Sequence, residues 1–289
     1  MRSEREMLDL ILDTASADER IRAVILNGSR ANPNARRDFF QDFDVRYIVR
    51  EVDSFTRDLG WIRRFGELMI LQTPDVMGEV LPAPEAPFTY LMQFADGNRI
   101  DLHLFPIARF TELEQDSLSV LLLDKDGLFE PFAPADERDY LPKPPSPSQF
   151  AACCNEFWWV CPYVAKGLWR GEFAYARHML DVVVREPLLQ MLEWYVGAKF
   201  GGSRNPGKFG KYLQDCLEPE LWDLLLKTYA DGDYAPSWAA LFAAGDLFRQ
   251  TAQHVAQAYG LEYPQQDDER VSAHLRRVQT LPPDAPGMY

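Results

Sequence analysis

Asp42 and Asp44 stand two positions apart, just before an apolar run that ends at Val49. In a β-strand, side chains two positions apart point to the same face, so these carboxylates would project together, with Cα atoms about 7 Å apart. Such close like charges repel unless a cation lies between them. Because Mg²⁺ prefers carboxylate oxygens together with substrate phosphates, the pair predicts a metal site for phosphoryl-type chemistry. The plainer interpretation is a solvated aspartate pair at the start of a strand.

Two further motifs favour the metal site. The segment 96–99 (DGNR) predicts a hairpin turn, and the strand that leaves it places Asp101 between apolar neighbours. A carboxylate there is costly unless it binds a cation or acts in catalysis. Gly28 and Ser29 follow another apolar run, with a helix start expected at residues 32–33. A Gly-Ser turn between a strand and a helix can present N–H groups and a hydroxyl to phosphate oxygens. Three carboxylates on neighbouring strands beside such a turn match a nucleotidyl-transfer site.

Strand patterns dominate the first half of the chain. Short runs rich in β-branched and aromatic residues, bounded by Gly, Pro, Asp or Asn, predict strands. They cover Arg22 to Leu26, Asp44 to Val49, Glu67 to Gln72, Phe88 to Phe94 and Ile100 to Phe105. Helical periodicity at residues 3–14 and around 54–64 lies between them, so this half is predicted to be a mixed α/β layer.

The second half has longer, helical periods. Residues 131–148 contain six prolines, which interrupt helices and strands alike. Helical patterns follow at 149–170, 172–198, 207–216, 218–230 and 236–259. The predicted fold class is α+β: a catalytic domain with a mixed sheet over 1–135, a proline-rich linker over 136–148, and a helical bundle over 149–263. Residues 264–289 are polar and interrupted by prolines, which predicts a loosely ordered tail.

Composition excludes several classes of protein. The net charge of −14 argues against a nucleic-acid binder, because phosphate backbones need a basic face. We find no apolar run long enough to span a bilayer and no secretory signal pattern at the N-terminus, so the sequence predicts a cytoplasmic protein without a membrane partner. The 4 cysteines form no C-x-x-C pair and the 4 histidines lack zinc spacing. The acidity suits a cationic small partner, or serves solubility alone.

Taken together, the motifs resemble a known family. Gly28-Ser29, the Asp42-x-Asp44 pair and the later strand aspartate Asp101 resemble the nucleotidyltransferase superfamily related to polymerase β. More closely, the blocks NGSRAN, DFFQDFDVRYIV, FGELMILQTPD, FADGNRIDLHL, NEFWWVCPYVAKGLWRGE and GKFGKYL are similar to the aminoglycoside 6-adenylyltransferases, which modify streptomycin. The blocks run from about residue 27 to residue 212, so the resemblance covers most of the chain. The stretch between Ser29 and Asp42 is longer than in many members of the superfamily, but it fits this family.

The resemblance implies a role for each motif residue. The three aspartates, Asp42, Asp44 and Asp101, would be the catalytic residues and would ligate two Mg²⁺ ions that hold the triphosphate of the co-substrate ATP. Gly28 and Ser29 would hold the β- and γ-phosphates, with Arg30 nearby. The acceptor hydroxyl would attack the α-phosphorus in line and expel pyrophosphate.

The general base is left open at this point. Asp101 would lie close to the acceptor hydroxyl, but a carboxylate that ligates metal is a weak base. Glu67, Glu79 and a metal-polarised hydroxyl are the alternatives.

The helical half supplies further candidates. Lys166 and Lys211 (or Lys208 beside it) could reach a triphosphate oxygen across an interdomain cleft, although an ordinary surface charge explains each of them equally well. A cationic aminoglycoside needs carboxylates and an aromatic wall, which Glu156, Asp181 and Trp159 (or Trp158) could provide. For the tryptophans, packing in the core is the plainer interpretation.

The predicted function is Mg²⁺-dependent transfer of AMP from ATP to a hydroxyl of a streptomycin-like aminoglycoside, by a monomer. Two alternatives stay open. The acceptor could be another small molecule, because the three aspartates do not define the acceptor pocket. The chain could also be a non-catalytic, nucleotide-binding or antitoxin-like protein that keeps the fold. Retention of three mutually repelling aspartates argues against a pure binder.

Overall fold

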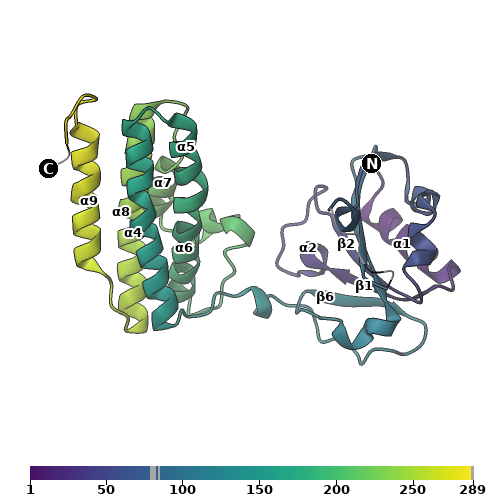
Figure 1. Cartoon of the computed structure of the whole chain (residues 1–289). Helices are drawn as coiled ribbons and strands as arrows, with labels where there is room; N and C mark the ends of the chain where they lie inside the picture. The colour runs from purple at the N-terminus through teal and green to yellow at the C-terminus, as the bar shows by residue number, and fades with distance from the viewer. Residues whose placement is uncertain (79–82, 84, 288–289) are drawn as a thin grey trace. The chain divides into compact units, whose positions relative to one another are not determined.

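The computed structural model describes residues 1–78, 83 and 85–287. The chain divides between Asp139 and Tyr140 into two compact units, a division that lies inside the predicted proline-rich segment 136–148. The first unit is built around a mixed β-sheet and the second consists of helices, so the fold class is α+β (Figure 1). Within the described ranges, no helix is both long and apolar enough to cross a membrane.

Six strands form the sheet of the first unit, in the order β3-β4-β5-β2-β1-β6. Their bounds are β1 Ile21–Asn27, β2 Phe43–Val49, β3 Leu68–Gln72, β4 Phe88–Phe94, β5 Arg99–Pro106 and β6 Ser119–Asp124. The pairing of β2 with β5 is parallel, and the other four pairings are antiparallel. All five predicted strands are present, and β6 is a strand that the sequence analysis missed.

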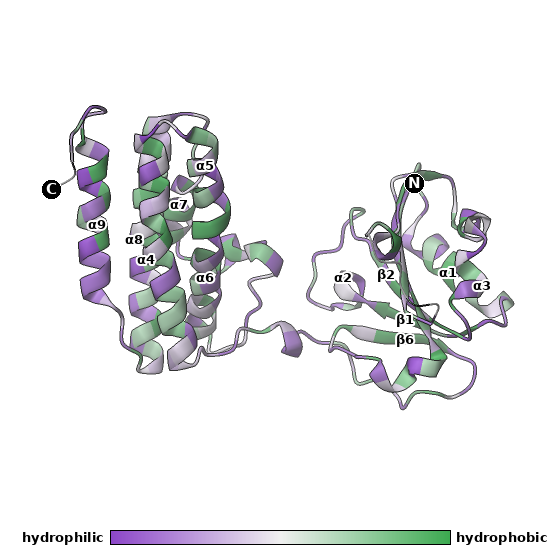
Figure 2. Ribbon diagram, in the orientation of Figure 1, coloured by the Kyte–Doolittle hydropathy of each residue, from purple (hydrophilic) through white to green (hydrophobic). Residues whose placement is uncertain are grey.

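The two faces of the sheet differ. Alternate residues of β2 and β5, including Val45, Tyr47 and Leu102, are fully buried against Met7 and the rest of the helix α1 (Glu4–Ala17). The short helix α3 (Asp53–Thr56) and the 3₁₀ segment Leu59–Phe65 also contribute to this core. These two elements occupy the predicted helical region around residues 54–64. Figure 2 shows β1 and β6 as largely hydrophobic ribbons.

The opposite face is apolar at one end and acidic at the other. Ile48 of β2 and Phe105 of β5 belong to a small second core, together with residues of the segment 107–132. Asp44 and Asp101 lie on the same face, four residues before Ile48 and Phe105 respectively. The sheet therefore carries its acidic pair at the end where β2 and β5 begin.

The helical unit contains five longer helices and an irregular connection among its described residues. The helices are α4 Pro147–Trp169, α6 Arg185–Lys199, α7 Pro219–Lys227, α8 Tyr234–Tyr259 and α9 Gln265–Thr280. α4 begins with a capping box in which Ser146 and Gln149 bond each other's backbone N–H groups. α8 ends at Gly260, which adopts the left-handed conformation that favours glycine. In the core of this unit Phe157 stacks on Phe248, and Trp158 meets both rings edge-on.

Two helical predictions need correction. The region 172–198 is not one helix: α5 (Phe173–His178) passes through a π-helical segment, Met179–Val184, into α6. The region 207–216 forms two short 3₁₀ turns, Lys208–Gly210 and Leu213–Asp215.

The predicted loose tail also differs from the structure. Residues 265–280 form α9, whose hydrophilic surface is visible in Figure 2. Its Asp268 is 1% exposed and accepts a hydrogen bond from Arg249 at 2.7 Å and another from the Tyr263 hydroxyl at 2.8 Å. Leu275 and Val278 are buried on the same face. The local polarity that predicted disorder thus reflects an exposed face and a buried ion pair.

Candidate active site

The parallel pairing of β2 with β5 brings Asp44 and Asp101 together. Their Cα atoms are direct partners in the register, and both side chains lie on the face that points away from α1. Asp42 lies immediately before β2 at the same end of the sheet. The structure therefore places the three predicted aspartates at one site, although they are 59 residues apart at most along the chain.

Burial and mutual repulsion affect these carboxyl groups. Burial raises the pKa of Asp44 to about 6, and the negative charges of Asp101 and Asp42 add to this effect. Burial also raises the pKa of Asp42, with a further contribution from Asp101. The raised values mean that both carboxyl groups are costly to ionise in this buried position unless a cation joins them.

Arg99 is the cation that contacts this site. Its Nε and Nη2 atoms each donate to an oxygen of Asp101 at 2.7 Å, and its Nε lies 3.6 Å from the Asp42 carboxylate. Sequence reasoning did not single out Arg99, because it placed this residue in the turn before the predicted strand. In the structure β5 begins at Arg99, so Arg99 and Asp101 are two positions apart in the strand and share a face.

Gly28 forms the wall of the site beside Asp44. Its φ of +68° is in the left-handed region, and a Cβ atom at this position would lie 2.2 Å from the Asp44 Oδ2 atom. Its N–H donates to the Leu118 carbonyl at 3.1 Å, which ties the turn to the start of β6. Only glycine fits here without displacement, so the backbone of the Gly28-Ser29 turn packs directly against a metal-ligand candidate.

The turn itself differs from the predicted one. The helix after β1 is α2 (Gly28–Ala31), which begins at Gly28 rather than at residues 32–33 and spans a single turn. Asn32 follows as its C-cap. The reason is local: β1 ends at Asn27, whose side chain donates to the Ser119 hydroxyl at 2.7 Å, so the chain leaves the sheet at once.

Arg30 points into the protein. It is 7% exposed, its guanidinium stacks 3.7 Å from the ring centroid of Phe43, and it donates to the carbonyl oxygens of Gln41 at 2.7 Å and Asp42 at 3.0 Å. The predicted role of Arg30 near the phosphates stays a prediction. In this structure Arg30 fixes the backbone that carries Asp42.

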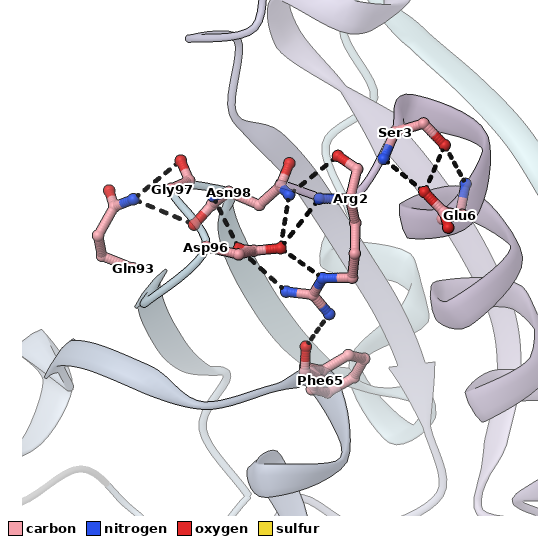
Figure 3. Close-up of polar contacts among 8 residues, drawn as sticks. All are labelled: Arg2, Ser3, Glu6, Phe65, Gln93, Asp96, Gly97 and Asn98. Atoms are coloured by element: carbon pink, nitrogen blue, oxygen red, sulfur yellow. Dashed lines mark hydrogen bonds and ion pairs between the residues drawn. The ribbon is translucent and has the colours of Figure 1, made fainter.

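A network at the turn of the β4–β5 hairpin holds the start of β5 in place (Figure 3). Arg2 donates its backbone N–H and its Nε to Asp96 at 3.1 and 2.7 Å, and it also donates to the Phe65 carbonyl. Asn98 donates to the Arg2 carbonyl at 3.1 Å. The Arg2 guanidinium holds the pKa of Asp96 well below its usual range. Because the turn precedes Arg99 directly, these contacts position Arg99 and Asp101.

The donor set fits Mg²⁺. The three side chains offer hard carboxylate oxygens, and the absence of a side chain at Gly28 is what lets the Asp44 carboxylate lie against the turn. Across the described part of the chain, no three His, Cys, Asp or Glu side chains already surround a common point as they now lie. At this site, both oxygens of Asp101 accept hydrogen bonds from Arg99, so the Asp101 carboxylate is turned toward Arg99.

The alternatives for the general base are reduced by the structure. Glu67 precedes the edge strand β3 and its carbonyl accepts from Ala95 at 2.8 Å. Because β3 is two strand spacings from β5, Glu67 lies about 10 Å from β5 in the plane of the sheet. Its backbone contact places it beside the residue that begins the β4–β5 turn and not beside Asp101. Glu79 lies outside the described residues.

The acceptor-site candidates belong to the helical unit and do not gather at one place. Asp181 lies in the π-helical segment, lines a pocket of about 600 Å³ and pairs with Arg177 at 2.8 Å. Trp159 is 64% exposed and lines a different pocket of about 610 Å³ between α4 and α9. Trp158 is buried in the core, as the plainer interpretation expected, and Glu156 is exposed on α4.

The two predicted phosphate-binding lysines also lie in the helical unit. Lys166, near the end of α4, has its Nζ 4.9 Å from the Tyr163 ring centroid and lines a pocket of about 340 Å³. Lys211 follows the first 3₁₀ turn after α6 and is exposed, with its Nζ 4.9 Å from the Tyr212 ring centroid. Their role toward phosphate stays a prediction.

The mixed sheet, its strand aspartates and the glycine turn packed against them define the class: the chain is a nucleotidyltransferase. It belongs to the streptomycin adenylyltransferase family, whose model matches residues 1–278. The aminoglycoside 6-adenylyltransferase of Campylobacter jejuni is 42% identical over 279 residues, covering 96% of each chain. That of Bacillus subtilis strain 168 is 39% identical over 270 residues, covering 93% of this chain and 95% of its own.

A solved structure was also compared. The crystal structure of an aminoglycoside 6-adenyltransferase from Bacillus subtilis matches 97% of this chain and all of its own, at 34% identity and a TM-score of 0.48.

Proposed function

We propose that this enzyme transfers AMP from ATP to the 6-hydroxyl of a streptomycin-like aminoglycoside and releases pyrophosphate. The names of its relatives, which share 32–42% of their residues with it over nearly their full lengths, support the reaction and the acceptor class. One structural observation supports the assignment of the site: Asp44 and Asp101 are direct partners in the β2–β5 register, with the Gly28 backbone packed on Asp44.

Each residue at the site would have a definite task. Asp42, Asp44 and Asp101 would hold two Mg²⁺ ions, which supply the positive charge that neutralises the triphosphate when bound. Gly28 and Ser29 would orient the β- and γ-phosphates beside Asp44. Arg30 would hold the Asp42 backbone in place through its two carbonyl contacts. Lys166 and Lys211 are the proposed further contacts to phosphate.

The acceptor would bind to the helical unit. Asp181 lies in a π-helical segment, a feature that is frequent at functional sites, and shares its pocket with Glu186 and Glu193. These carboxylates suit a cationic acceptor. Trp159 offers an exposed aromatic face, although it lines another pocket, and Glu156 has no contact that favours it over other surface acids. We therefore favour Asp181 among the three acceptor candidates.

The test is pyrophosphate release by the purified protein with ATP, Mg²⁺ and a panel of aminoglycosides, followed by mass spectrometry of the modified drug. Streptomycin should stimulate release and carry one AMP group at the 6-position. Asp44→Asn should abolish turnover, whereas Glu67→Gln, a change of the same kind two strands from the site, should leave it intact. If the protein binds ATP but no aminoglycoside stimulates release, the proposal is wrong. Stimulation by a different small acceptor would instead identify the alternative transferase.

A further inference from the structure

We propose that Arg99 is a positioning residue that serves as a resident counter-cation: it holds the aspartates in place before metal binds and is displaced from Asp101 when a divalent ion takes its oxygens. This inference rests on the proposed metal-binding role of Asp42, Asp44 and Asp101. It assigns to Arg99 a part in setting the metal affinity of the enzyme.

The contacts of Arg99 carry the argument. It engages both oxygens of Asp101 at 2.7 Å and approaches Asp42 at 3.6 Å, so one guanidinium bridges two of the three carboxylates. Over residues 1–78, 83 and 85–287, no other basic side chain lies within ion-pair distance of these three carboxylates. Arg30, which is nearby, contacts the Asp42 carbonyl rather than its carboxylate.

The bidentate geometry makes Arg99 and a metal ion competitors. An oxygen that accepts a short hydrogen bond from a guanidinium has that lone pair directed at the N–H group, and a cation that approached the same oxygen would meet a positive charge. Both oxygens of Asp101 are engaged in this way. Each oxygen keeps a second lone pair, but an ion bound there would lie close to the guanidinium charge, so metal binding at Asp101 favours displacement of the Arg99 side chain.

The surroundings of Arg99 allow this movement. Its side chain is 39% exposed, whereas that of Asp101 is 14% exposed, so the guanidinium has open solvent beside it while the carboxylate is held on the strand. The backbone on both sides is fixed, by the β5 pairing and by the Arg2 network at the preceding turn. Only the Arg99 side chain needs to rotate, and the aspartates stay in place.

Two opposite effects follow from removing this guanidinium. Without metal, the carboxylates lose their only ion-pair partner within the described residues, so the protein should unfold more easily. With metal, no competitor remains, so the ion should bind more tightly. If the open state is about one-tenth populated in the wild type, the gain in affinity is about tenfold. A residue with a purely structural role would instead lower stability and metal affinity together.

The experiment measures Mn²⁺ affinity from the electron paramagnetic resonance signal of the free ion, and thermal unfolding in excess chelator, for the full chain. Arg99→Gln should bind Mn²⁺ about tenfold more tightly and melt at a lower temperature than the wild type in chelator. Arg99→Lys keeps one charge and should lie between the two. Arg138→Gln is the matched control, because Arg138 also forms a bidentate pair with an aspartate two positions away, Asp136. It should leave Mn²⁺ affinity unchanged.

The outcomes separate the two proposals. Equal or weaker Mn²⁺ binding by both Arg99 variants would overturn the inference about Arg99 alone. Absence of Mn²⁺ binding by the wild type, or binding that survives Asp44→Asn unchanged, would overturn the proposed metal site itself. If Arg99→Gln does not fold, the Arg99→Lys variant decides the question by the same two readouts.

Discussion

Replacement of Gly28 by alanine tests the close packing between the glycine turn and Asp44. Two costs are expected. The backbone is held at φ +68°, where an L-residue with a Cβ costs about 1–2 kcal/mol. In addition, the new Cβ would meet the Asp44 Oδ2 atom at 2.2 Å, so the carboxylate or the turn must move by about 1 Å to restore a normal contact. A displacement of about 1 Å at a reacting centre lowers turnover by about 100-fold.

Gly127 provides the matched control in the same unit. Its φ of +62° is nearly that of Gly28, but nothing lies within 4 Å of its Cβ position. Gly127→Ala should therefore lose about 1–2 kcal/mol of unfolding free energy with normal turnover. Gly28→Ala should lose more stability than this and about two orders of magnitude in kcat/KM. Both are measured by urea unfolding and by pyrophosphate release with streptomycin. If the two variants behave alike in both assays, the packing of Gly28 on Asp44 has no role in the site.

Two further predictions concern buried carboxyl groups. Folding raises the pKa of Asp44 from an ordinary 3.8 to about 6. Between these pH values the carboxyl group ionises more readily in the unfolded chain, so the free energy of unfolding falls as the pH rises. Without metal, this loss of stability is on the order of 2–3 kcal/mol. In chelator, Asp44→Asn should thus match the wild type near pH 4 and exceed it in unfolding free energy above about pH 6; the opposite trend in urea titrations would contradict the raised pKa. Asp268→Ala should cost about 3 kcal/mol, because it removes the buried carboxylate that Arg249, Tyr263 and Ser272 share, although Arg249 keeps its more exposed pair with Asp246. The exposed neighbour Asp267 is the control, and equal losses for both alanine variants in chemical denaturation would show that the ion pair does not anchor α9.

The sheet and its aspartates could be predicted because their signals are local. Alternation of apolar and polar residues marks β2 and β5, and an aspartate two residues from another in a strand must share its face. The same argument did not reach Arg99, because the predicted strand began one residue later, at Ile100, whereas β5 begins at Arg99. Local patterns do not contain the register, which depends on how β2 and β5 pair across the 49 residues between them.

The reasons why other features were not predicted are also physical. β6 is a short run of consecutive apolar residues whose periodicity does not distinguish a strand from a buried helix. α9 is polar along most of its length, and it is held by the Arg249–Asp268 pair, which no local pattern reveals. The resemblance placed Arg30 near the phosphates, and nothing in the residues around it shows that Phe43 and two carbonyl groups would enclose its guanidinium.

The parallel register of β2 and β5 has a consequence for how faithfully this protein is made. Slipping β5 by one residue would turn Arg99 and Asp101 into the apolar core and expose Leu102 in their place. Because burying a guanidinium and a carboxylate among aliphatic side chains is costly, such a chain would be expected to remain unfolded rather than persist as a folded but inactive enzyme. A slipped register thus gives an unfolded chain instead of a folded enzyme with a misplaced site, and cellular proteases remove unfolded chains. A cell that makes this protein would then carry few intact copies with a misaligned site.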